Sequence, residues 1–188
     1  MKKIIVGLGN PGTKYAKTRH NAGWLLMDRL VAELGAETGQ KINWRTKKDW
    51  SAEVAEIGDS LLVKPQTMMN NSGKAIRAIL DYYNLLAEDL TNILLVIHDE
   101  LDLLTGTTRW STNSRAAGHN GVQSIIDYLG TQKFNRYRFG IQPTEKPAET
   151  IDYVLTKFSA AELKKLQQVD LIEIKQFINN ISTIYLFC

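Results

Sequence analysis

Three histidines and one aspartate carry most of the reactive chemistry of this sequence. The histidines occur in the dipeptides HN (20–21), HD (98–99) and HN (119–120), and each lies at the end of a strand-like stretch or in the loop after one. Histidine changes its charge near neutral pH, so it serves readily as a general base. Because strand ends line the crevice of an open α/β sheet, we expect these distant side chains to converge there.

Asp99 directly follows the apolar run ILLVI and His98. A carboxylate in such surroundings is costly unless it is paired, and the most natural partner is a histidine from another segment, His20. The pairing would fix the imidazole tautomer and leave the other ring nitrogen free to take a proton from water. Neighbouring strand residues point to opposite faces, so His98 and Asp99 share one cleft only if the strand ends or bulges there. His98 receives no role.

Water is the expected nucleophile. The sequence lacks a G-x-S-x-G motif, and its single cysteine is the last residue, Cys188. Asparagine side chains offer N–H donors to a developing oxyanion and acceptors to backbone N–H groups, so Asn10, Asn70 and Asn120 are candidates to orient the amide groups of a substrate. The predicted chemistry is hydrolysis.

A metal centre is a competing use of the three histidines. Zinc-binding motifs such as H-E-x-x-H, or closely spaced Cys and His residues, do not occur in the sequence. We therefore expect no metal. Burial in the core or capping of a helix is the other alternative, above all for His98.

A glycine-rich loop precedes the first histidine. The stretch GLGNPG (7–12) matches G-x-G-x-x-G and follows an apolar run, as in dinucleotide-binding loops. Such a loop needs its last glycine in a helix and an acid at the end of a second strand. Here Pro11 interrupts the motif, and the nearest acids, Asp28 and Glu33, lie on an expected helix. The glycines instead indicate a tight loop that presents Asn10 at its apex.

Short strand-like runs alternate with helical patterns, which predicts an α/β fold in a single domain, residues 1–188. The turn GDS (58–60) between SAEVAEI and SLLVKP predicts a hairpin, so the sheet should be mixed. Further strands are expected at KIIVGL, NILLVIHDE, GTTRWST and RYRFGI. Four helices are expected, at AGWLLMDRLVAEL, at NSGKAIRAILDYYN, at about 120–129, and after an S-x-x-E capping box at Ser159 and Glu162. The first two carry apolar stripes that should cover a sheet face: Met27, Leu30, Val31 and Leu34; Ile76, Ile79, Leu80 and Tyr83.

The composition is that of an ordinary globular protein, with 44% hydrophobic and 23% charged residues, so disorder is not expected. The longest aliphatic run, residues 93–97, is too short to span a membrane, and the apolar start is too short for a signal peptide. We expect a cytoplasmic location without membrane contact. The stretches KINWRTKKDW (41–50) and QKFNRYR (132–138) mix basic and aromatic residues, which suits a nucleic acid, although solvated surface is the plainer alternative.

Six stretches resemble the bacterial peptidyl-tRNA hydrolase family and occur in the family's order: VGLGNPGTKYAKTRHNAG (6–23), KPQTMMNNSG (64–73), IHDELDL (97–103), AGHNGVQSI (117–125), FNRYRFGI (134–141) and YVLTKFS (153–159). The resemblance implies a twisted mixed sheet surrounded by helices and a monomer without metal or nucleotide cofactor. It also implies cleavage of the ester between a peptide and the 3′ ribose of tRNA.

The resemblance assigns roles to residues by their match to family motifs. His20 would be the general base, and Asp99 would hold it. The remaining positions would line the crevice or contact the substrate, with Tyr15 near the 3′ end of tRNA: Asn10, Tyr15, Met69, Asn70, His119 and Asn120.

Contacts to the tRNA backbone are expected from basic residues. Arg138 matches a family residue that grips a phosphate, and Lys133 and Arg136 lie beside it in the sequence. Ser111 stands where the family often has a basic residue that clamps the 5′ phosphate of tRNA, and Arg109 or Arg115 is expected to substitute. Two further departures are the stretch RFGIQP, one residue shorter than the family's R-x-G-I-G-x-P, so that the loop after it is expected to differ in shape, and the apolar end STIYLFC.

Two alternative functions compete with hydrolysis. A non-catalytic RNA-binding module of the same fold exists among chloroplast splicing factors that resemble the family, but such a module has no need of the predicted His20 and Asp99 pair. A nucleotide-dependent dehydrogenase is disfavoured by the context of the glycine motif.

Overall fold

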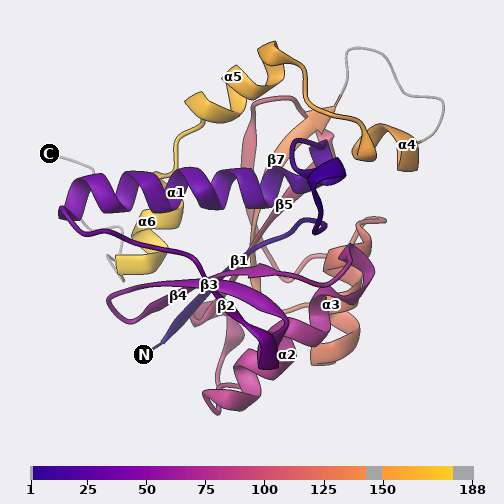
Figure 1. Ribbon diagram of the computed structural model, residues 1–188. Coiled ribbons are helices and arrows are strands. Elements are labelled where there is room, and N and C mark those ends of the chain that lie inside the picture. Colours follow the sequence, from indigo (N-terminus) through magenta and orange to yellow (C-terminus); the bar gives the residue numbers. More distant parts are fainter. Residues whose placement is uncertain (1, 143–149, 180–188) are drawn as a thin grey trace, which may run out of the picture.

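A seven-stranded mixed sheet forms the centre of the computed structural model, which describes residues 2–142 and 150–179 (Figure 1). The strand order is β2-β3-β4-β1-β5-β7-β6. Strands β4, β1, β5 and β7 run parallel, whereas β2, β3 and β6 pair in antiparallel fashion with their neighbours. The strands are β1 (Lys3–Gly7), β2 (Arg45–Lys47), β3 (Ala52–Ile57), β4 (Ser60–Pro65), β5 (Leu94–Leu104), β6 (Thr108–Thr112) and β7 (Asn135–Gln142).

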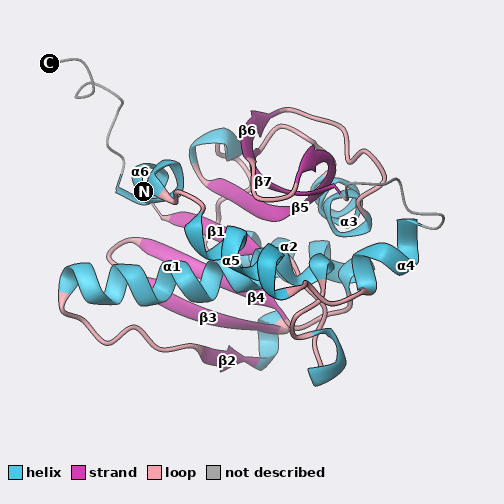
Figure 2. Ribbon diagram, turned by 90° about the horizontal axis from the view of Figure 1, so that it is seen from above, coloured by secondary structure: helices cyan, strands magenta, loops and turns pink. Residues whose placement is uncertain are grey.

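Helices cover both faces of the sheet (Figure 2). Helix α1 packs on one face together with residues of α5 and α6, and α2 and α3 pack on the other. The helices are α1 (Ala22–Thr38), α2 (Ser72–Tyr82), α3 (Asn120–Leu129), α4 (Thr150–Leu155), α5 (Ala160–Gln168) and α6 (Ile172–Asn179). Short 3-10 turns lie in the connecting loops. η1 (Thr13–Tyr15) follows β1, η2 (Arg19–Asn21) precedes α1, η4 (Met69–Asn71) precedes α2 and η5 (Leu90–Asn92) precedes β5. A further one, η3 (Lys48–Trp50), precedes β3.

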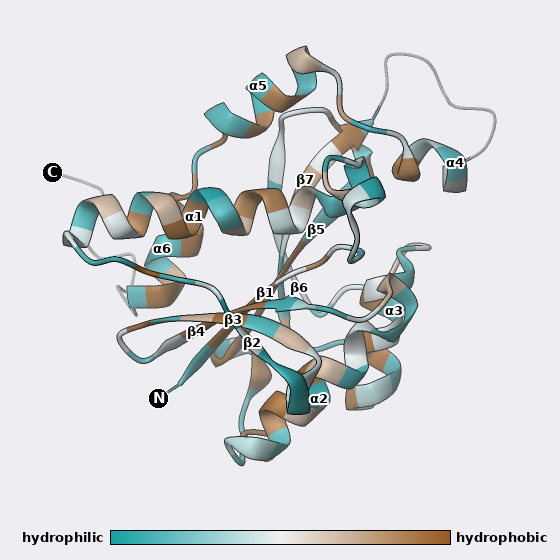
Figure 3. Cartoon of the chain, in the orientation of Figure 1, coloured by the Kyte–Doolittle hydropathy of each residue, from teal (hydrophilic) through white to brown (hydrophobic). Residues whose placement is uncertain are grey.

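The two cores follow from the alternation of side chains along the central strands. Ile4 and Val6 of β1 face the α2 and α3 side, and Ile5 between them faces α1. The central strands are apolar on both sides, as expected of strands covered on both faces, and they form the brown band in Figure 3. All four residues of the first predicted helical stripe are buried; in the second, Tyr83 lies just past the end of α2 and is only partly buried.

The predicted α/β fold with a mixed sheet is confirmed, as are the β3–β4 hairpin and the capping box at Ser159 and Glu162. The short edge strand β2 was not predicted, because its three residues are all exposed and carry no apolar pattern. The loop after β7 (143–149), which was expected to differ in shape from that of the family, and the end STIYLFC, with Cys188, lie outside the described residues. Within the described part of the chain, no helix combines the length and apolar character that crossing a membrane requires.

Two glycines, Gly7 at the end of β1 and Gly23 in the first turn of α1, allow α1 to pack closely on the sheet. A Cβ atom added to Gly23 would lie 2.5 Å from the backbone nitrogen of Leu8 and 2.6 Å from its oxygen, so only glycine fits there. A Cβ atom on Gly7 would lie 2.6 Å from the oxygen of Gly23. The first turn of α1 therefore contacts the backbone at the end of β1, and this contact brings the residues just before α1 to the end of the sheet.

Candidate active site

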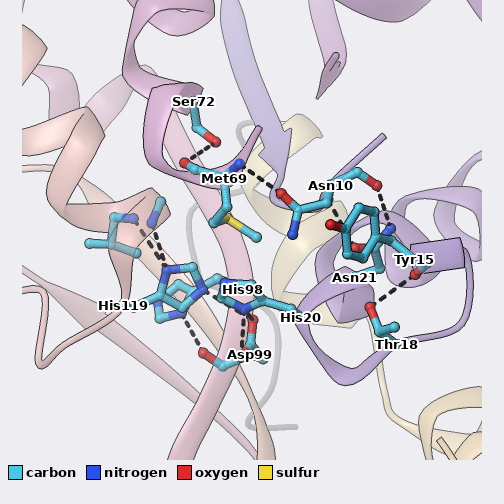
Figure 4. A network of polar contacts seen from close by, with 12 residues as sticks. Asn10, Tyr15, Thr18, His20, Asn21, Met69, Ser72, His98, Asp99 and His119 are labelled. Carbon is cyan, nitrogen blue, oxygen red and sulfur yellow. Dashed lines mark hydrogen bonds and ion pairs between the residues drawn. The ribbon is translucent and has the colours of Figure 1, made fainter. Parts of the chain in front are cut away.

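The Asp99 carboxylate lies between two imidazole rings (Figure 4). Nδ1 of His20 is 3.0 Å from Oδ1 of Asp99 and 3.2 Å from Oδ2, and Nε2 of His119 is 3.0 Å from Oδ1. Asp99 is 3% exposed and His20 8%, so bulk water screens these contacts little. The predicted contact between His20 and Asp99 is confirmed, whereas their catalytic role stays a prediction.

The position of Asp99 depends on unequal strand lengths. The pairing of β1 with β5 ends at Gly7 and Ile97, but β5 continues to pair with β7 through Glu100. The edge of β5 that had faced β1 is therefore open from His98 onward, and side chains from both sheet faces can approach it. Strand β5 does not end at His98 and Asp99 but runs on to Leu104, with a register shift between Glu100 and Leu104.

His119 has its tautomer fixed by the start of α3. Its ring is the N-cap of that helix, and Nδ1 accepts hydrogen bonds from the backbone N–H groups of Gly121 (3.1 Å) and Val122 (3.3 Å). A neutral imidazole that accepts through one nitrogen carries its proton on the other. Nε2 of His119 is therefore the donor to Asp99. His119 was expected in the crevice from the sequence, but this hydrogen bond was not, since its only signal in the sequence is a histidine at a helix start.

The charges of the site shift in the direction that suits a base. Burial alone would raise the pKa of Asp99, but the two imidazoles, through charge and hydrogen bonds, hold it well below its usual range. For His20, burial alone would lower the pKa, but the charge of Asp99 and its hydrogen bond more than offset this and raise the pKa above the ordinary 6.5. Asp99 therefore stays ionised, and neutral His20 keeps its proton on Nδ1 with Nε2 free.

His98 packs behind this pair and does not join it. Its Nδ1 donates to the backbone oxygen of Asp99 at 2.7 Å, and its ring meets that of His119 edge-on, with centroids 4.7 Å apart. Nε2 is buried and finds no hydrogen-bond partner among the residues that the structure describes. Burial, reinforced by His119, holds the pKa of His98 well below the usual value, so the ring stays neutral. The observed role of His98 is to pack against the ring of His119.

Asn10 joins the loop before α1 to the loop before α2 at the edge of the site. Its backbone N–H donates to Oδ1 of Asn21 (2.9 Å), whose Nδ2 donates back to the oxygen of Asn10 (3.0 Å). Its side-chain oxygen accepts from the backbone N–H of Met69 at 2.8 Å. Asn10 is buried, at 3% exposure, so its side chain is not presented to bulk solvent. The side-chain nitrogen points away from Met69, on the side where His20 lies (Figure 4).

The other predicted substrate residues surround this centre at different depths. Met69 is buried, and its sulfur packs against Gly121 at the start of α3. Tyr15 is partly buried in η1, whereas Asn70 and Asn120 are exposed, in η4 and at the first position of α3. The loops after β1, β4 and β6 thus supply all of these residues.

Two of the four basic residues predicted to bind tRNA lie beside the site. Arg138 is the strand neighbour of His98, and Arg109 on β6 is the neighbour of Arg138, so the three lie in a row on one face. Nη1 of Arg138 is 3.2 Å from Oε2 of Glu100. Arg109, at the outer end of this row, is exposed.

The other two lie elsewhere. Arg136 is 2% exposed and donates to the backbone oxygens of Arg115 (2.7 Å) and Ser114, and burial with the nearby Arg138 lowers its pKa to about 10. The prediction that it contacts tRNA is therefore wrong in this geometry, because β7 is covered and the guanidinium holds the loop that leads to His119. Lys133 is exposed at the opposite end of β7, near Asp89. Ser111 faces Arg136 across the strands, with its hydroxyl buried.

A metal ion fits the donor types of the site but not its hydrogen bonds. One ligand atom from each of His20, Asp99 and His119 lies within 4.8 Å of the others, as a metal site requires. A metal bound to Nε2 of His119 would move the ring proton to Nδ1, where it would face the two backbone N–H groups of α3. The helix cap therefore favours hydrogen bonding to Asp99 over metal binding.

Known proteins share this fold over nearly the whole chain. The family model described as peptidyl-tRNA hydrolase matches residues 4–184. A peptidyl-tRNA hydrolase of Mesoplasma florum is 48% identical over 164 residues, which is 87% of this chain and 84% of the relative. The crystal structure of peptidyl-tRNA hydrolase from Acinetobacter baumannii is 28% identical with a TM-score of 0.81, and that of a peptidyl-tRNA hydrolase complex with N-propanol is 29% identical with a TM-score of 0.79. Each comparison covers 95% of this chain and 89% of the other. The chain therefore belongs to the peptidyl-tRNA hydrolase family.

Proposed function

We propose that this protein hydrolyses the ester bond between the C-terminal carboxyl of a peptide, or of an N-acylated amino acid, and the 3′ ribose of tRNA. The observation that carries the proposal is the hydrogen bond from Nδ1 of His20 to Asp99, which leaves Nε2 of His20 unprotonated and available. Family membership supports the substrate.

The reaction begins with a water that donates a proton to Nε2 of His20 as it attacks the ester carbonyl. The anionic Asp99 stabilises the imidazolium that forms. The negative charge on the carbonyl oxygen of the tetrahedral intermediate needs a donor, and Nδ2 of Asn10 is suited to this role. When the intermediate collapses, the C–O bond to the ribose breaks and His20 returns the proton to the leaving 3′ oxygen. The products are tRNA with a 3′ hydroxyl and a carboxylic acid, which loses its remaining proton to solvent and leaves as a carboxylate.

The surrounding residues suit the two parts of the substrate. Met69, Asn70 and Asn120 border the centre where the peptide and the terminal nucleotide meet, and Tyr15 offers an aromatic face to that nucleotide. Arg109 and Arg138 supply positive charge to a tRNA phosphate beside the site. In line with the family resemblance, the protein acts as a cytoplasmic monomer without a metal. A binding-only RNA module is the less favoured function, because it has no use for a histidine with a free nitrogen and a paired carboxylate.

Replacement of His20 tests the base directly. His20→Ala should lower kcat by about 10² to 10⁴, with KM for tRNA substrates little changed, because proton transfer is lost and binding groups remain. The assay is release of an N-acylated amino acid from tRNA in the presence of a chelator. A defect confined to KM would overturn the assignment. An inactive wild type that still binds tRNA would favour the RNA-binding module.

The pH dependence tests the role of Asp99. His20 works as a base only when neutral, and its pKa is raised, so kcat/KM should rise with pH through a midpoint above 6.5. Asp99→Asn removes the charge that raises this pKa and leaves burial, which lowers it. The midpoint should therefore move down, while kcat falls because an amide no longer selects the His20 tautomer. A profile with the wild-type midpoint and rate would remove Asp99 from the mechanism.

Salt dependence tests the position of the tRNA backbone. Arg109→Gln should weaken tRNA binding and reduce the slope of log affinity against log salt by about one, since one phosphate contact is lost. Lys133→Gln, at the far end of the sheet, is the matched control and should leave both quantities unchanged. Equal effects of the two substitutions would contradict the placement of tRNA beside Arg138.

A further inference from the structure

Arg19 directly precedes His20, and its side chain is fully engaged by the C-terminal part of the chain. Nε and Nη2 donate to the two carboxylate oxygens of Glu162 at 2.9–3.0 Å. Nη1 donates to the hydroxyl of Thr156 and to the backbone oxygen of Lys157 (3.2 Å). All three nitrogens of the guanidinium are therefore engaged by this part of the chain. The side chain is 11% exposed, so Arg19 is not available to bind RNA.

The backbone before His20 is fastened to the same segment. The N–H of Arg19 donates to the oxygen of Thr156 at 3.0 Å, and the N–H of Phe158 donates to the oxygen of Lys17 at 2.9 Å. Thr18 and Lys157 also pair as an isolated antiparallel β-bridge. The segment that joins α4 to α5 therefore runs beside η2, as the orange and indigo ribbons show in Figure 1.

Glu162 has two functions at the start of α5. Its Oε2 accepts from the backbone N–H of Ser159 at 2.7 Å and completes the capping box, while both of its oxygens bind Arg19. Burial opposes its charge, but the contacts with Ser159 and Arg19 lower the pKa of Glu162. The segment between α4 and α5 is itself anchored in the core, since Phe158 is buried and the hydroxyl of Tyr153 donates a hydrogen bond to the backbone oxygen of Ile141 at 2.7 Å. Arg19 thus binds a fixed partner.

The residue after His20 is fixed as well, because the side chain of Asn21 forms two hydrogen bonds with the backbone of Asn10. η2 comprises three residues and has no side-chain cap of its own. The position of the η2 backbone, from which the His20 ring reaches Asp99, therefore depends on the contacts of its two neighbours, one to the glycine-rich loop and one to Glu162.

We propose that Arg19 is a positioning residue which, through Glu162, holds η2 so that the His20 ring stays on Asp99. This inference rests on the proposed function and deepens it, because it makes the segment from α4 to α5 part of the support of the base. The contribution is to turnover and not to tRNA binding, since each guanidinium nitrogen of Arg19 already contacts the α4–α5 segment and the side chain is 11% exposed.

Substitution of both partners tests the proposal. Arg19→Ala should lower kcat by about 10- to 100-fold with KM within about 2-fold, because a small misplacement of a base has effects of that size. Glu162→Gln keeps the capping box, which accepts glutamine, but weakens the ion pair, so its loss should be smaller. The double variant should lose no more than Arg19→Ala alone, since the two residues act as a unit. Arg19→Lys should restore only part of the rate, because a single ammonium does not reproduce the two-pronged contact.

A second readout separates positioning from general stability. The pKa of His20, measured by NMR titration, should fall toward 6.5 in Arg19→Ala because contact with Asp99 loosens. Lys175→Ala is the matched control. It removes two ion pairs, both 2.6 Å, that join α6 to Glu33 and Glu37 in the C-terminal half of α1. It should change neither kcat nor the pKa of His20. A raised KM with unchanged kcat, or a lower Tm with an unchanged His20 pKa, would overturn the proposal. An inactive wild type would refute the proposed function, and the His20 pKa of the variants would still decide the positioning role.

Discussion

The buried negative charge of Asp99 is the constraint on which the rest of the site depends. A carboxylate with 3% exposure costs several kcal/mol unless partners compensate for the lost water. Here the compensation comes from two imidazoles that approach along the open edge of β5, His20 from the α1 side and His119 from the α3 side. Each imidazole donates one N–H hydrogen bond to Asp99, and this common requirement fixes both ring orientations. The free nitrogen of His20 follows from it.

Helix starts bring the partners to this charge. The parallel strands β1 and β4 end at the same edge of the sheet, so the loops that lead to α1 and α2 meet there. Asn10 ties these two loops together through Met69 and Asn21. The loop that leads to α3 is held by Arg136, which donates to its backbone oxygens, and it ends at His119. Side chains of the interior thus orient loops, and the loops orient the side chains of the site.

The sequence was sufficient to predict a contact or an element where few arrangements could satisfy a physical requirement. The contact of Asp99 with His20 could be predicted because a carboxylate after an apolar strand needs a partner and the chain offers few histidines. The helices and the hairpin followed from periodicity and turn residues. Arg136 was misjudged because basic residues alternating with aromatics look alike whether a strand is exposed or covered on both faces. Its burial depends on packing by distant elements.

Contacts between distant segments were beyond prediction for a related reason. The capping box identified Glu162 as the start of a helix, but nothing local indicates that its carboxylate also binds Arg19, 143 residues away. Likewise, the proton position on His119 depends on which ring nitrogen caps α3, a matter of geometry and not of residue type. Sequence thus predicted which chemical groups the site contains, and the structure was needed to show how they are held.

The most direct test of the account is the protonation of the histidine nitrogens in the wild-type protein, observed by NMR of ¹⁵N-labelled histidine above the pKa of His20. The account predicts that neutral His20 carries its proton on Nδ1 with Nε2 unprotonated, and that His119 shows the opposite arrangement, with its proton on Nε2. A His20 ring protonated on Nε2 would have no lone pair for the attacking water. That result would contradict the assignment of His20 as the base oriented by Asp99.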